Sequence, residues 1–218
     1  LERHYDVAAS LQAMYEEALF HRLDWLQRKT GARSLCLAGG CALNSVANGR
    51  ITERTAFREV FVQPAAGDAG TALGAAQYVW HQVLEQPPRV TMEHAYWGPQ
   101  FSEAQLLAAL SQRLPGFRSP SEGEALRLDE VVVRRMRSED DLLRDTAAVI
   151  AKGGVVGWYQ GRSEWGPRAL GNRSIVADPR REDMRGILNE RVKRREPFRP
   201  FAPAVLEERA SDYFEGAS

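Results

Sequence analysis

The spacing of apolar residues predicts a long amphipathic helix near the start of the chain. Between Asp6 and Lys29, leucines and one tyrosine recur every three or four residues, which places them on one helical face. Gly31 follows the last of these positions, and glycine commonly ends helices there. We therefore expect a helix over residues 6–29 that packs against a core.

The next fifty residues alternate between two kinds of pattern. Short apolar runs at 34–40 and 59–64 are typical of buried strands, and each runs into a loop of glycines and alanines. Helical spacing follows each loop, over 44–54 and again beyond residue 70. This order predicts an α/β layer with a largely parallel sheet.

A segment rich in proline and glycine divides the chain. We interpret residues 87–100 as a linker between a first domain, residues 1–86, and a second domain, residues 101–218. The second domain is also predicted to be α/β. Its expected helices cover 102–114, 138–152 and 184–192, and its expected strands cover 155–160 and 174–177.

Composition adds that the protein is an ordinary soluble globular one. Lys and Arg together number 29, as do Asp and Glu, so no overall charge attracts nucleic acid or an anionic membrane. Residues 162–199 nevertheless carry eleven basic side chains against six acidic ones. Any anion site should therefore be local, and we expect neither a nucleic acid nor a membrane as partner.

The cysteines and the amino terminus suggest a compartment. Cys36 and Cys41 lie in an apolar stretch and are expected to be small buried side chains in a reducing environment. No segment approaches the roughly 20 apolar residues of a membrane helix, and no signal-peptide pattern is present. We expect a cytoplasmic protein, and the initial Leu1 suggests a fragment.

Two glycine loops are the first candidates for chemistry. GGCALN at 39–44 and GDAGTALG at 67–74 each lie between a predicted strand and a predicted helix, where backbone N–H groups can bind phosphate. Tight turns without a ligand would have the same pattern. Asp68 either caps the following helix or faces a metal. The four histidines are scattered, so further metal ligands would have to lie outside this chain.

A second candidate is the loop at 161–174. It combines Arg162, Arg168 and Arg173 with Asn172 and Ser174, among glycines and a proline that restrict the backbone. Arginine forks can bind a phosphate bidentately, while Asn and Ser can bond an attached acyl group. The alternative is a solvated loop with weak Arg–Glu pairs. We interpret the cations of 191–195 as the solvated end of a helix.

Longer strings in this chain resemble one enzyme family. GGCALN, GDAGTALGAA, GWYQGRSEWGPRALGNRSIVADPR and REPFRPFAPAVLEE are similar, in order, to O-carbamoyltransferases of the NodU/CmcH/TobZ family. The resemblance implies an actin-like ATPase domain of the TsaD type followed by a YrdC-like domain. It further implies that carbamoyl phosphate and ATP form carbamoyl-adenylate, and that the carbamoyl group passes to a hydroxyl of a small natural product.

The resemblance also implies roles for individual residues. In the transfer domain, Gly39, Gly40 and Asn44 would contact nucleotide, Gly67 and Gly70 would shape the second loop, and Asp68 would be one ligand of an iron-type metal, Fe²⁺. In the activating domain, the ligands of carbamoyl phosphate or of ATP with Mg²⁺ would be Arg162, Arg168, Asn172, Arg173, Ser174 and Arg199, with Arg168, Asn172 and Arg173 acting in catalysis.

Some features depart from the family pattern. The family carries a His-x-x-x-His metal pair that this chain lacks, and its members continue beyond the PFRPFAPAVLEE string. We therefore expect this chain alone to lack carbamoyl transfer. Competing interpretations are an actin-like ATPase or sugar kinase, and an RNA-binding YrdC relative. The sequence determines neither the acceptor nor the oligomeric state, for which a homodimer is one candidate.

Overall fold

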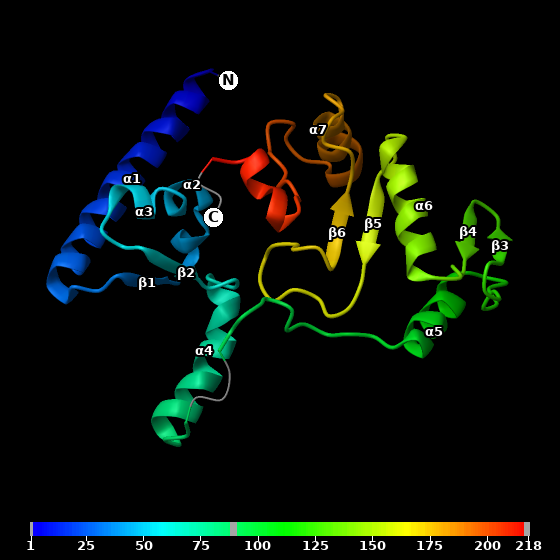
Figure 1. Ribbon diagram of the computed structural model, residues 1–218, viewed down its shortest axis with the longest axis horizontal. Helices are drawn as coiled ribbons and strands as arrows, with labels where there is room; N and C mark the ends of the chain where they lie inside the picture. Colours follow the sequence, from blue (N-terminus) through cyan, green and yellow to red (C-terminus); the bar gives the residue numbers. More distant parts are fainter. Residues whose placement is uncertain (1, 88–90, 216–218) are drawn as a thin grey trace. The chain divides into compact units, whose positions relative to one another are not determined.

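The computed structural model describes residues 2–87 and 91–215 of the chain, which form two compact units (Figure 1). One unit holds the chain up to Pro99 together with Arg162–Ala169, and the other holds Gln100–Gly161 and the chain from Leu170 onward. Both units mix helices with small sheets, so the predicted α/β class is confirmed. Residues 88–90 of the predicted linker lie outside the described residues.

The first unit begins with the predicted long helix. Helix α1 spans Glu2–Thr30, and Gly31 ends it with a positive φ of 65° while its N–H donates to the Gln27 carbonyl at 2.7 Å. Strand β1 (Ser34–Leu37) pairs with β2 (Glu59–Val62) in parallel, with Leu35 opposite Val60. The predicted parallel arrangement is therefore confirmed for this strand pair.

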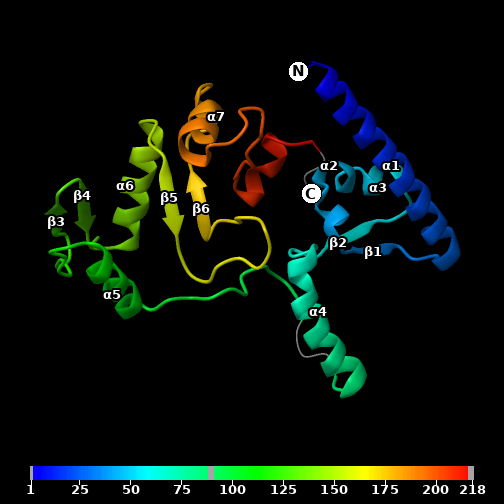
Figure 2. The same cartoon turned by 180° about the vertical axis from the view of Figure 1, so that it is seen from behind.

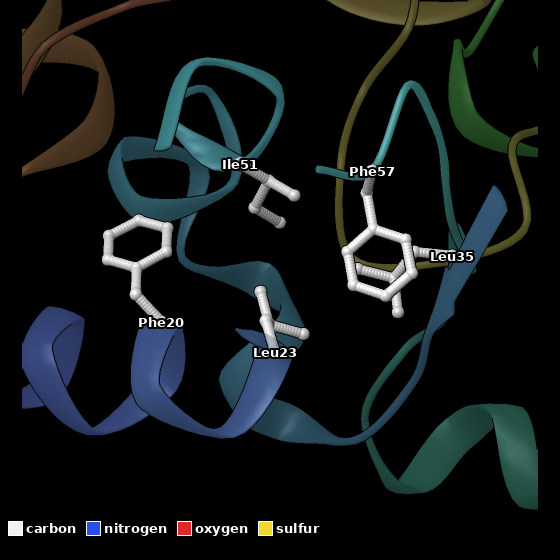
Figure 3. Packing of buried hydrophobic residues seen from close by; sticks show 5 residues of the cluster. All are labelled: Phe20, Leu23, Leu35, Ile51 and Phe57. Atoms are coloured by element: carbon white, nitrogen blue, oxygen red, sulfur yellow. The ribbon is translucent and has the colours of Figure 1, made fainter. Parts of the chain in front are cut away.

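The core of this unit lies between α1 and one face of the two strands. Phe20 and Leu23 of α1 meet Leu35, Ile51 and Phe57, all of them at most 5% exposed (Figure 3). Side chains alternate between the faces of a strand, so Leu35 faces this core while its neighbour Cys36 faces the other side. The opposite face of the strand pair is consequently free to line a pocket.

Each strand leads into a loop and a helical segment. After β1 come η1 (Gly40–Leu43), α2 (Ser45–Asn48) and α3 (Ile51–Arg54), so the single helix predicted over 44–54 is interrupted. After β2 come η2 (Asp68–Gly70), α4 (Thr71–Tyr78) and the π-helical turn η3 (Val79–Val83). The helix predicted beyond residue 70 is confirmed.

The second unit starts with a helix and a hairpin. Helix α5 (Glu103–Arg113) is followed by β3 (Ala125–Leu128) and β4 (Val131–Arg134), an antiparallel pair that the sequence analysis did not predict. Helix α6 (Glu139–Ala151) begins as expected, with the Ser138 hydroxyl accepting the Asp141 N–H at 3.2 Å.

The remaining strands of the second unit form another antiparallel pair. Strands β5 (Val156–Tyr159) and β6 (Arg173–Val176) lie side by side, with α6 next to β5 (Figure 2). They are followed by α7 (Met184–Ile187), η4 (Leu188–Lys193) and η5 (Glu207–Asp212). The predicted strands and the helix over 184–192 are confirmed, whereas parallel pairing among the described strands occurs in the first unit alone.

The structure corrects the interpretation of the cysteines. Cys36 and Cys41 are both exposed and both free, rather than buried. Successive side chains of a strand point to opposite faces, so Cys36 points away from the core that Leu35 faces. Cys41 lies in the turn η1. No helix within residues 2–87 and 91–215 is long and apolar enough to cross a membrane.

Candidate functional site

A pocket of about 460 Å³ lies at the carboxyl ends of β1 and β2, within the first unit. The strands contribute Cys36, Leu37 and Phe61 to its lining, and the two loops contribute small residues and Asp68. Ligands of α/β proteins commonly bind at this edge of a parallel sheet. The candidate site therefore lies where both glycine loops begin. Its lining residues are Cys36, Leu37, Ala38, Gly39, Phe61, Gln63, Ala65, Ala66, Gly67, Asp68, Gly70, Thr71, Leu73, Gly74 and Gln77.

The two glycine loops contact each other directly. The Gly39 N–H donates to the Ala66 carbonyl at 2.7 Å, and Gly39 has a φ of 98°, a backbone region that favours glycine. At Gly70 a Cβ atom would collide with the Ala65 carbonyl oxygen. The glycines at 39 and 70 are thus required by backbone geometry and by close packing. Together with Gly67, they contribute only main-chain atoms to the pocket lining.

Asp68 is the one Asp, Glu, Lys, Arg or His in the described pocket lining. It is exposed and does not cap a helix: the cap position of η2 is Gly67, that of α4 is Gly70, and neither makes a side-chain capping bond. The Asp68 main-chain carbonyl accepts the Thr71 hydroxyl at 2.6 Å. Of the two alternatives for Asp68, capping of the following helix is therefore wrong, and the exposed residue lines the pocket.

The described residues do not form a metal centre on their own. Across 2–87 and 91–215, no three His, Cys, Asp or Glu side chains lie close enough together to hold a metal ion. One exposed carboxylate is an insufficient donor set for iron, which needs several nitrogen or oxygen ligands. No chemical step is therefore assigned to a metal here.

Two of the residues expected near nucleotide lie outside the pocket lining. Gly40 begins the turn η1, and Asn44 caps α2 by accepting the Ala47 N–H at 3.1 Å. The Asn44 amide also exchanges two hydrogen bonds with Gln12 of α1, at 2.8 and 3.3 Å. The structure thus gives Asn44 a role in attaching the first glycine loop to helix α1.

Helix α1 supports this loop through further polar contacts that the sequence did not reveal. The Tyr15 hydroxyl donates to the Cys41 carbonyl at 3.1 Å. Glu16 is buried, and its carboxylate accepts from Gln12 at 2.9 Å and from Arg50 at 2.5 Å. These donors hold the pKa of Glu16 below its ordinary value. The sequence signal that could have revealed this contact was Glu16 itself, an acidic residue on the core side of a predicted amphipathic helix.

Part of the loop at 161–174, called the arginine loop below, belongs to the first unit. Within Arg162–Ala169, the Trp165 N–H donates to the Ala95 carbonyl at 2.6 Å, and the Ser163 N–H donates to Pro99 at 3.0 Å. The guanidinium of Arg162 donates to the carbonyls of Gly98 at 3.1 Å and Trp97 at 3.3 Å. Arg162 therefore anchors the start of the loop to main chain.

The other two arginines of the loop, Arg168 and Arg173, differ sharply in their contacts. The Arg173 guanidinium donates to the carbonyls of Gln160 at 2.6 Å and Gly161 at 3.1 Å, and it stacks on the Tyr159 ring at 3.5 Å. Arg168 is exposed and makes no hydrogen bond or ion pair with the part of the chain that the structure describes. Arg162 and Arg168 belong to the first unit, and Arg173 belongs to the second.

The remaining predicted ligands all lie in the second unit. Asn172 accepts from the Gln160 amide at 3.2 Å, and the Ser174 hydroxyl accepts the Gly171 N–H at 3.0 Å. Arg199 is exposed and pairs with Glu196 at 2.8 Å. Phosphate binding by these side chains stays a prediction.

Asn189 is a fully buried polar residue that the sequence analysis missed. Its amide donates to the carbonyls of Pro197 at 3.2 Å and Arg199 at 2.9 Å, and it accepts from the Arg195 guanidinium at 2.7 Å. Arg195 also stacks on Phe201, so the interpretation of this residue as a solvated cation is wrong. Asn189 fixes the turn that carries Arg199.

The fold and the pocket define an α/β protein with a ligand site at the carboxyl edge of parallel strands. Two family models match this chain, the carbamoyltransferase N-terminus over residues 1–77 and the carbamoyltransferase C-terminus over residues 147–218. They occur in that order and together span more than half of the chain. The chain belongs to the carbamoyltransferase family.

Curated relatives support this assignment. Nodulation protein NolO of Bradyrhizobium diazoefficiens is 44% identical over 214 residues, covering 98% of this chain and 36% of its own length. An uncharacterised protein of Synechocystis sp. is 43% identical over 218 residues, covering 98% of this chain and 33% of its own length. Nodulation protein U of Sinorhizobium fredii is 36% identical over 185 residues, covering 84% and 28%. The chain spans about a third of the length of these relatives.

Proposed function

We propose that this chain is part of an ATP-dependent O-carbamoyltransferase whose first unit is TsaD-like and whose second unit is YrdC-like. The complete protein would convert carbamoyl phosphate, ATP and water into carbamoyl-adenylate, pyrophosphate and phosphate. A hydroxyl of a small-molecule acceptor would then attack the carbamoyl carbon, and AMP would leave. Membership of the carbamoyltransferase family supports the transferred group.

The observation that carries the nucleotide part of the proposal is the pocket between the two glycine loops. Gly39 and Ala66 join the loops through a 2.7 Å hydrogen bond, and the lining at Gly39, Gly67 and Gly70 is main chain. Glycine allows a phosphate to approach the backbone closely. We infer that the nucleotide of carbamoyl-adenylate lies in this pocket during transfer.

The second unit supplies the proposed ligands for carbamoyl phosphate. Arg199 would bind a phosphate oxygen from a turn held rigid by Asn189, and Asn172 would bond the carbamoyl amide. The guanidinium would neutralise phosphate charge, and the side-chain amide would recognise the carbamoyl amide. This chemistry does not require a covalent nucleophile. Asp68 would contribute one carboxylate to a metal site completed from outside the described residues.

The test is pyrophosphate release by the complete protein in the presence of Mg²⁺. We expect release that requires both ATP and carbamoyl phosphate, and a fall of at least about tenfold in Arg199→Ala. Arg209→Ala is the matched control, because Arg209 is exposed and pairs with Asp212 just as Arg199 pairs with Glu196. Pyrophosphate release that ignores carbamoyl phosphate would contradict the proposal and favour a simple ATPase.

A further inference from the structure

Helix α1 contacts the first glycine loop through a pair of side-chain amides. The Asn44 amide donates to the Gln12 side-chain oxygen at 2.8 Å, and the Gln12 amide donates back to the Asn44 oxygen at 3.3 Å. The same Asn44 oxygen accepts the Ala47 N–H at 3.1 Å. Asn44 is therefore held from two sides, by the main chain of α2 and by a side chain of α1.

The orientation of this amide pair is determined at its two ends. The Ala47 N–H can only donate, so it fixes the position of the Asn44 oxygen. At the other end, Gln12 donates at 2.9 Å to Glu16, which is buried and pairs with Arg50. These donors hold the pKa of Glu16 below its ordinary value, so its carboxylate is ionised at pH 7 and can only accept. Gln12 must therefore turn its NH₂ group towards Glu16, which leaves its oxygen for the Asn44 amide.

A single turn connects Asn44 to the pocket. The Asn44 N–H donates to the Cys41 carbonyl at 3.1 Å, and the Ala42 N–H donates to the Gly39 carbonyl at 3.0 Å, so hydrogen bonds run along the whole of η1. The Tyr15 hydroxyl of α1 donates to the same Cys41 carbonyl. Gly39 lines the pocket, whereas Asn44 does not. A displacement of Asn44 would therefore reach the pocket lining through the backbone of this turn.

We propose that Gln12, oriented by Glu16, is a positioning residue for the nucleotide site, because it holds the first glycine loop in place through Asn44. Gln12 itself would not touch the ligand. This inference rests on the proposed function, since it takes the pocket to be the nucleotide site. Phe20 and Leu23 keep α1 in the core independently of Gln12. Loss of the Gln12 amide should therefore weaken nucleotide binding by the loop more than it weakens the fold.

Cys36 provides a readout of the pocket that does not depend on turnover. Its thiol is exposed and lines the pocket, so a bound nucleotide should shield it from iodoacetamide. Peptide-resolved mass spectrometry of the complete protein would measure the alkylation rate of Cys36 at increasing ATP concentrations. Circular dichroism would record the melting temperature of each variant.

Three substitutions and one control test the contact. Gln12→Met keeps the length of the side chain and removes its hydrogen bonds. Gln12→Glu keeps an acceptor for Asn44 but brings a second carboxylate beside Glu16. Asn44→Ser keeps an oxygen that can cap α2 but shortens the side chain that contacts Gln12. Glu17→Ala, at an exposed position of the same helix, is the control.

We expect ATP to protect Cys36, and both Gln12 variants to raise the ATP concentration for half-protection about fivefold or more. Glu17→Ala should match the unaltered protein. Added to Asn44→Ser, Gln12→Met should change half-protection less than twofold, because its effect passes through Asn44.

A merely structural role of Gln12 would lower the melting temperature and leave half-protection unchanged. Half-protection of both folded Gln12 variants within twofold of the unaltered protein would therefore overturn the inference alone. An undiminished effect of Gln12→Met in the Asn44→Ser protein would do the same. Failure of ATP to protect Cys36 in the unaltered protein would instead overturn the nucleotide pocket itself.

Discussion

Arginines that share one loop have different surroundings and therefore different expected roles. Arg162 and Arg173 donate to main-chain carbonyls, whereas Arg168 makes no such contact with the described residues. The sequence places all three among glycines and predicts a common phosphate site. It cannot distinguish them, because a guanidinium bonds a carbonyl as readily as a phosphate, and loop geometry decides which is within reach.

This difference predicts effects of different size on stability. Arg173→Ala removes the hydrogen bonds to the main-chain carbonyls of Gln160, Gly161 and Asn172 and the stacking on Tyr159, so we expect a loss of about 1–3 kcal/mol. Arg168→Ala should change stability by less than about 0.5 kcal/mol, as exposed substitutions usually do. Urea unfolding of both variants measures the difference. Equal losses would show that Arg168 has a structural partner after all.

Asp178 predicts a defined pH dependence. Hydrogen bonds from the Arg180 side chain and backbone lower the pKa of this buried carboxyl to about 2, below its ordinary 3.8. Because the folded state favours the ionised form, Asp178 stabilises the fold above about pH 4, and this contribution is lost as the pH falls through 2. The melting temperature of Asp178→Asn should lie below that of the unaltered protein at pH 7, and the gap should close towards pH 2. A constant gap would contradict this.

At the scale of secondary structure, periodicity predicted most of the helices and strands. The exceptions have physical causes. The hairpin of β3 and β4 turns at Asp129 with a φ of 49°, without the glycine that usually marks such a turn. The helix predicted over 44–54 is divided near Gly49, where α2 ends and the Gly49 N–H donates to the Ala47 and Ser45 carbonyls. The local sequence therefore predicted whether a segment is a helix or a strand better than it predicted where a helix is interrupted.

The core beneath the strand pair predicts a clear stability contrast. Phe57 is 1% exposed and packs with Leu35 and Ile51, so Phe57→Ala should cost about 3–5 kcal/mol through lost burial and a residual cavity. Tyr78→Ala on α4, where the side chain is 64% exposed, should cost less than about 0.5 kcal/mol. Urea unfolding followed by circular dichroism compares them. Similar midpoints would mean that Phe57 is not central to the core.

Gly166 tests whether the arginine loop is held against the first unit. Gly166→Ala would bring a methyl group into the Pro64 carbonyl and force a strained φ, so the loop should detach. We expect faster tryptic cleavage after Arg168. Gly157→Ala in β5 is the control, because a Cβ there meets nothing within 4 Å. Unchanged cleavage in Gly166→Ala would contradict the described packing.

On the scale of the whole molecule, sequence order and spatial grouping differ. Arg162–Ala169 follows β5 in the chain, yet it belongs to the first unit through Ala95, Pro99 and Pro64. No local pattern reports a contact across more than sixty residues, so the sequence assigned this loop to the second domain. The pocket, by contrast, was predictable in outline, because each glycine loop directly follows a strand of one parallel pair.

The most direct test of the account is mass spectrometry of the complete protein mixed with ATP, Mg²⁺ and carbamoyl phosphate. The account predicts a carbamoyl-adenylate mass that appears only when all three are present, and that disappears when carbamoyl phosphate is replaced by inorganic phosphate. A folded protein that binds ATP but never yields this mass would contradict the proposed activation step.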